Sequence, residues 1–164
     1  MAARIQERKV ADAARQYEDQ VLGTFADLSK VVYPPSYLED RVADALEDFK
    51  DEVKQAGIAE FEDYLKLQGQ TVEQLEADLR PGAERRARRG LVMRELAKVE
   101  TITVSKAEVD AAVTSEIEHQ VEHHNADLRE VTKAFRRKEN LDGIENQLLS
   151  RKVIDRMVTI AQGA

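Results

Sequence analysis

Residues 80–100 read RPGAERRARRGLVMRELAKVE, a pattern typical of a helix with two apolar sides. A rotation of 100° per residue sorts the apolar positions of this stretch into two groups. One side holds Ala83, Ala87, Gly90 and Leu91. The nearly opposite side holds Val92, Leu96 and Val99. We expect this helix to run to about Val99 with Pro81 in its first turn, where a missing N–H costs no hydrogen bond.

The two apolar sides of this helix leave two interpretations open. Small residues favour close packing against a neighbouring helix, so the second stripe needs a cover of its own. Either the helix is sandwiched between two others, or one stripe faces a groove. An apolar patch beside arginines is typical of a protein-binding surface. On this pattern Val92, Met93 and Leu96 are candidate polypeptide-binding residues.

Helical periodicity extends over the chain before this stretch. We expect a long helix over residues 2–32, a second from Pro35 to Ala56, and a short helix that ends at Gly69. Thr71 with Gln74 is a capping-box signature for another short helix before Pro81.

The same periodicity continues after residue 100. A β-branched connector, residues 101–104, precedes a capping box of Ser105 with Glu108 that opens a further helix. We expect Asn125 to break that helix and to cap the next one. A final helix carries Leu141 through Ile160, so every predicted element is helical.

Composition supports an all-α fold. The chain has 164 residues, of which 35% are charged and 42% hydrophobic, and its net charge is −7. Its 7 glycines and 3 prolines are too few for the turns of a β-sandwich or barrel. The absence of cysteine excludes disulfides and thiolate metal sites. No run of about 18 apolar residues is present, and the charged start is unlike a signal peptide, so we expect a cytoplasmic protein without a membrane segment.

No motif indicates catalysis or a cofactor. The sequence lacks the GxSxG, GxGxxG and phosphate-loop patterns, so we expect no enzyme activity and no cofactor. His119 and His123 have the i,i+4 spacing of a zinc pair, but no remote histidine completes the site, and we expect no metal. The arginines at 80–94 lack interleaved aromatic residues, so we expect ion pairs or a solvated face there and no nucleic-acid binding.

Three segments carry a resemblance to a known family. They are the double-proline helix start YPPSYLEDRV at 33–42, the stretch 79–100 continued into ITVSKAEV at 102–109, and residues 129–157. Their order and spacing resemble the C-terminal domain of bacterial trigger factor, a ribosome-associated chaperone, over nearly the whole chain.

The resemblance implies one domain, 1–164, with an elongated helical body and two arms that form a cradle. The connector and body helices would be 1–56, the arms 57–101 and 102–140, and the closing helix 141–164. Matching arm positions implies that Val121, Val131 and Phe135 contact clients, and the apolar pattern adds Leu128. The family's ribosome-docking and prolyl-isomerase modules have no counterpart in this sequence, so we expect neither activity from it.

The leading hypothesis is an ATP-independent chaperone that binds unfolded or nascent polypeptides, with a weak homodimer as an additional option. A helical self-association module without client binding is the main alternative. A periplasmic chaperone of the SurA type, whose peptide-binding core has a similar fold, is a third.

Overall fold

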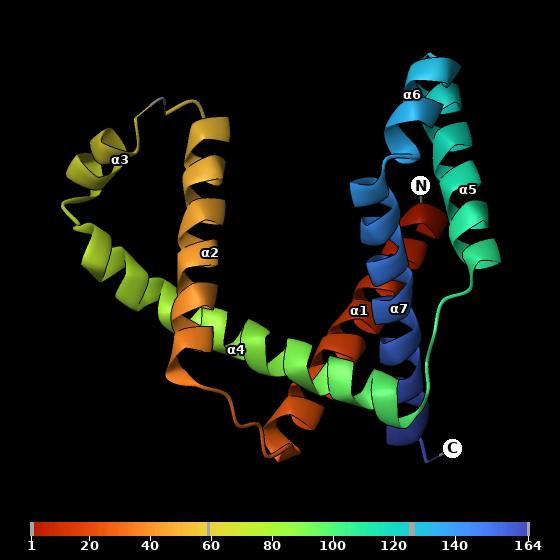
Figure 1. Cartoon of the computed structure of the whole chain (residues 1–164), viewed down its shortest axis with the longest axis horizontal. Helices are drawn as coiled ribbons and strands as arrows, with labels where there is room; N and C mark the ends of the chain where they lie inside the picture. Colours follow the sequence, from red (N-terminus) through yellow and green to blue (C-terminus); the bar gives the residue numbers. More distant parts are fainter. Residues whose placement is uncertain (1, 59, 125–126, 164) are drawn as a thin grey trace. The chain divides into compact units, whose positions relative to one another are not determined.

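The protein is described by a computed structural model that covers residues 2–58, 60–124 and 127–163, with side chains for 6–58, 60–122 and 127–163. Within these ranges it has helices and no strand, which confirms the all-α fold (Figure 1). The helices are α1 (Ala2–Leu28), α2 (Pro35–Gln55), α3 (Phe61–Gln68), α4 (Val72–Val99), α5 (Lys106–His124), α6 (Leu128–Phe135) and α7 (Lys138–Ala161). None of the described helices is long and apolar enough to cross a membrane.

Helix α4 corrects the prediction of two helices separated at Pro81. A single helix spans Val72–Val99 with Pro81 inside it. A proline inside a helix removes one backbone hydrogen bond, so contacts elsewhere must hold the two halves in line. Helix α2 provides them, because Leu75 packs in a cluster with Leu46 and Ala83 packs in another with Val42.

Helix α1 ends at Leu28, four residues before the predicted end at residue 32. The hydroxyl of Ser29 donates a hydrogen bond of 2.6 Å to the carbonyl of Phe25, which also accepts from the Ser29 amide at 3.1 Å. Helix α2 begins at Pro35, as the double proline predicts, since the fixed φ of proline suits the first helical position.

Both predicted capping boxes are confirmed. The amide of Thr71 donates to Gln74 Oε1 at 2.9 Å, and the amide of Gln74 donates to Thr71 Oγ1 at 3.3 Å. The Ser105 amide donates to Glu108 Oε2 at 2.9 Å, with the reciprocal bond at 3.3 Å. The predicted cap at Asn125 lies outside the described residues. Helix α6 is capped by Asp127, whose carboxylate accepts hydrogen bonds from the backbone amides of Arg129 and Glu130.

The chain divides into two compact units. Unit 1 comprises Met1–Leu22 with Met93–Ala164, and unit 2 comprises Gly23–Val92. The arms predicted at 57–101 and 102–140 are a different division of the chain, and they stay a prediction.

Unit 2 is held by α2 packing against α3 and α4. One apolar cluster joins Val42 and Ala45 to Ala83, and a second joins Leu46 to Leu65 and Leu75. The Ala83 side chain is 1% exposed, which confirms the close packing expected of the small residues on that side of α4. Gly90 is exposed instead, and open space surrounds the position where a Cβ would stand.

Part of the arginine stretch forms contacts between helices of unit 2. Arg80 makes a two-pronged ion pair with Glu39, with N–O distances of 2.9 and 2.6 Å. Arg88 donates to the carbonyl of Ala26 at 3.2 Å. The expected ion pairing is therefore confirmed at Arg80.

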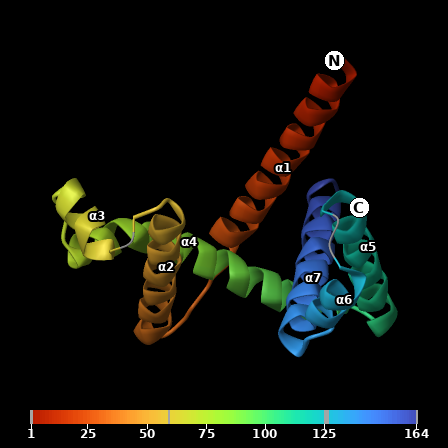
Figure 2. The ribbon, with the colours of Figure 1, turned by 90° about the horizontal axis from the view of Figure 1, so that it is seen from above.

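Unit 1 is built around α7. Val153 and Met157 are each 1% exposed, and Val113 and Ile117 of α5 are also buried. Helices α5, α6 and α7 pack side by side in both views of the ribbon (Figure 2). This three-helix assembly positions the candidate site.

Gly143, within α7, offers a test of the helical assignment. Its position is exposed, and no atom lies within 4 Å of the place where a Cβ would stand. We expect Gly143→Ala to stabilise the protein by about 0.5–1 kcal/mol, because alanine loses less backbone entropy on folding. Gly57→Ala is the matched control, since Gly57 has φ +91° and a Cβ would be strained there. Thermal unfolding should show a rise in Tm for the first variant and a fall for the second, and a lowered Tm for Gly143→Ala would contradict the structure.

Candidate functional site

A groove of about 740 Å³ lies between α5, α6 and α7 of unit 1. Its walls are formed by Ala112 and Glu116 of α5, Phe135 of α6, and Ile144, Gln147, Leu148, Ser150, Arg151 and Ile154 of α7. Aliphatic and aromatic side chains line most of it, and Glu116 and Arg151 add one charge of each sign. A concave apolar surface with few polar groups is suited to holding apolar side chains of another molecule.

Helix α6 leaves its apolar face without full cover. The face is formed by Leu128, Val131 and Phe135, and none of the described residues of this helix is buried. Leu128 is 58% exposed, while Val131 and Phe135 are half-buried. Because α6 packs against α5, which carries the half-buried Val121, these predicted residues belong to the same three-helix assembly.

The predicted residues on α4 have a different setting. Val92 is only 8% exposed, so it contributes packing and little accessible surface. Met93 and Leu96 are half-buried, and Val99, the last residue of α4, is 72% exposed. The second apolar stripe of α4 is therefore covered at Val92 and open at its far end.

Several apolar residues with accessible surface were missed from the sequence. Ile144, Leu148 and Ile154 line the groove, although their spacing on α7 predicts only a buried stripe. Leu67 of α3 is 77% exposed in unit 2. Periodicity finds the apolar side of a helix but does not tell which part of that side a neighbour covers.

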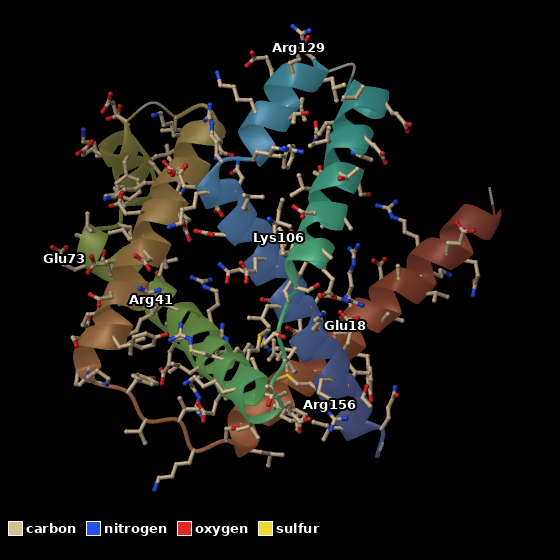
Figure 3. The ribbon with its side chains drawn as sticks, turned by 45° about the vertical axis from the view of Figure 1, so that its right-hand side comes forward. Glu18, Arg41, Glu73, Lys106, Arg129 and Arg156 are labelled. Atoms are coloured by element: carbon tan, nitrogen blue, oxygen red, sulfur yellow. The ribbon has the colours of Figure 1, made fainter. Side chains whose placement is uncertain are left out.

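Two charged residues line the groove, Glu116 on α5 and Arg151 on α7. Arg151 pairs with Glu18 of α1 at 3.1 Å and with Asp155 at 3.2 Å. Figure 3 labels Glu18 on α1. Glu116 accepts a hydrogen bond from Gln120 at 3.2 Å. The charges of both groove-lining residues thus have partners within unit 1.

Lys152 anchors the start of α5 to α7. Its ammonium group donates to the Thr103 carbonyl at 2.8 Å and pairs with Glu108 at 2.6 Å. The hydrogen bond from Lys152, with those from Ser105, lowers the pKa of the Glu108 carboxyl from 4.5 to about 2. The capping box therefore also positions α5, which forms one wall of the groove.

This anchor predicts a pH dependence. A carboxyl whose pKa is lowered by folding stabilises the protein above its unfolded pKa of 4.5, and this stabilisation is lost as pH falls toward about 2. We expect Glu108→Gln to lower Tm at neutral pH, and the difference from the unchanged protein to shrink as pH falls from about 6 to about 2. Thermal unfolding over this pH range measures the difference in Tm between the variant and the unchanged protein. Glu118→Gln, at an exposed position of α5, is the control. A difference independent of pH would contradict the anchor.

The histidines of α5 do not define a metal site in the described part of the chain. The side chains of His123 and His124 lie outside the described residues, and His119 is exposed. No group of three histidine, aspartate or glutamate side chains is placed to hold an ion within the described ranges.

Within the described residues, the chain consists of amphipathic helices, with an apolar groove in unit 1 and a partly open apolar face on α6, and these features place it in the class of all-α domains. The family model for the C-terminus of the bacterial trigger factor protein matches residues 1–159. The chain therefore belongs to the family of trigger factor C-terminal domains, which is the chaperone domain of that protein.

Individual relatives agree with this family. A trigger factor of Agathobacter rectalis is 35% identical over 107 residues, which is 65% of this chain and 24% of the relative. That of Carboxydothermus hydrogenoformans is 28% identical over 159 residues, 97% of this chain and 36% of the relative. That of a Geobacillus strain is 28% identical over 155 residues, 94% of this chain and 34% of the relative. The chain spans about a quarter to a third of the length of these relatives, and no solved structure is found to match it.

Proposed function

We propose that this domain is an ATP-independent chaperone that holds unfolded polypeptides on the apolar surfaces of unit 1. The groove between α5, α6 and α7, continued by the open face of α6, carries the proposal. The binding residues are Val121, Leu128, Val131 and Phe135 with the newly found Ile144 and Leu148, and Met93 and Leu96 form a second patch. Val92 is not included in that patch, because its side chain is buried.

The size of these patches fits weak, reversible binding. Burying one leucine or phenylalanine side chain contributes about 1.5–3 kcal/mol, whereas micromolar affinity requires about 8 kcal/mol. A single side chain therefore binds too weakly to hold a client, and several side chains of these patches must act together. A chaperone without an energy source needs weak, reversible binding. A client that folds withdraws its apolar side chains from the patches and is then released.

Aggregation of a chemically denatured client tests the function. We expect the protein, without nucleotide, to reduce light scattering of the diluted client in proportion to its concentration. A folded helical protein of similar charge, at equal concentration, serves as control. Scattering that is unchanged at several-fold molar excess of the protein would contradict the proposal.

Self-association is a second candidate, and helix α1 favours it. Val10 is 60% exposed and Tyr17 41% exposed, so the predicted apolar stripe of α1 is open along the first part of the helix. A second copy is one molecule able to cover it. Sedimentation over a range of concentrations, with and without client, separates the two functions. A tight dimer that excludes client favours self-association, and a monomer or a dimer opened by client favours the chaperone.

A further inference from the structure

The turn that joins α6 to α7 is basic, in contrast to the acidic chain around it. Lys133 near the end of α6, Arg136 and Arg137 between the helices, and Lys138 at the start of α7 are exposed, and we call these four residues the basic turn. None of them makes an ion pair with any residue in the described ranges. The basic residues in the second half of α7 differ, since Arg151, Lys152 and Arg156 all pair with carboxylates of unit 1. The basic turn is therefore a local excess of positive charge in a protein whose net charge is −7.

The basic turn is next to the groove. Phe135 lines the groove, and Arg136 and Arg137 follow it directly in the chain. Their Cα atoms therefore lie within about 4 and 8 Å of the Phe135 Cα atom. An extended arginine side chain placed there can reach a molecule seated in the groove. Helical rotation places Asp142 of α7 on nearly the opposite side from Ile144, which lines the groove. Asp142 thus does not neutralise the basic turn from the groove side.

We infer that the groove prefers client segments in which acidic residues flank apolar ones. This inference rests on the proposed function and specifies which polypeptides the site takes. Apolar client side chains enter between α5, α6 and α7, and neighbouring aspartate or glutamate side chains pair with the basic turn. Complementary charge at a rim mainly speeds association and selects among partners, while the apolar contacts supply most of the affinity.

A polypeptide fits this surface better than other anionic partners. Nucleic acid has phosphates for the basic turn but no aliphatic side chains for the groove. An amphipathic helix that binds a membrane lies in the interface with its apolar face inserted, whereas α6 packs against α5 and α7. An acidic, apolar segment satisfies both parts of the site.

Three fluorescent peptides with the same apolar core test the preference, with aspartate, lysine or serine flanks. We expect the aspartate-flanked peptide to bind about fivefold tighter than the lysine-flanked one at low salt, as several exposed pairs together allow. The ratio should fall toward one at about 0.5 M salt, where screening is strong. The double variant Arg136→Gln/Arg137→Gln should reduce the ratio to about twofold or less. The control Arg8→Gln/Lys9→Gln, with the same change of net charge on exposed positions of α1, should leave it unchanged.

The outcomes separate this inference from the function on which it rests. Equal binding of all three peptides overturns the preference and leaves the chaperone intact. Tighter binding of the lysine-flanked peptide, which the net charge of −7 alone would produce, also overturns it. Anionic phospholipid vesicles that bind in a manner sensitive to Arg136 and Arg137, without peptide selectivity, would assign the basic turn to membranes instead. If none of the peptides binds, both the preference and the proposed function fail.

Discussion

The double variant Leu128→Ser/Phe135→Ser is expected to need about ten times more protein than the unchanged chain to suppress client aggregation by half. Leu128 is 58% exposed, and Phe135 lines the groove, so both offer apolar surface to a client. Losing even half of the contribution of two such side chains weakens binding by about 1.5 kcal/mol or more, which corresponds to at least tenfold.

A matched control distinguishes loss of the site from a general loss of apolar surface. Leu67→Ser/Val99→Ser removes two side chains that are 77% and 72% exposed, neither of which lines the groove. We expect this control to suppress aggregation within about twofold of the unchanged chain. Circular dichroism of both variants should show unchanged helix content, since none of the four residues is buried. Equal loss in the two double variants would show that the groove is not the main binding surface.

The largest effect on stability is expected for Met157→Ala. Met157 is 1% exposed at the centre of unit 1, and truncating a buried methionine removes apolar contacts and leaves a cavity. The free energy of unfolding should fall by about 2–5 kcal/mol in urea titrations.

Val99→Ala is the control for this prediction, because the Val99 side chain is exposed and its truncation should change the unfolding free energy by less than about 0.5 kcal/mol. A change of that small size for Met157→Ala would contradict the assignment of α7 as the core of unit 1. A normal client-binding curve measured on whichever Met157→Ala molecules remain folded would show that the variant affects stability and not the surface.

Local signals in the sequence predicted the elements of this fold well. The capping boxes at Thr71 and Ser105 are seen with the expected bonds, and Pro35 begins α2 as the double proline indicates. These features depend on neighbours three or four residues apart, which a sequence shows directly.

Features that depend on distant contacts were predicted less well. Pro81 does not interrupt α4, because packing of α2 on both sides of it compensates for the lost hydrogen bond. The division of α4 between two units has no local signal. The burial of Val92 and the partial exposure of Ile144 also could not be predicted from spacing, since each lies on an apolar side whose cover comes from another part of the chain.

Methyl NMR of the 18.6 kDa chain with an unfolded client tests the central proposal most directly. We expect the methyl signals of Leu128, Val131, Ile144 and Leu148 to shift as client is added, and those of Val42 and Leu46, in the core of unit 2, to stay unchanged. The same client, once folded, should cause no shifts. Shifts absent from α6 and α7, or equal shifts with the folded client, would contradict it.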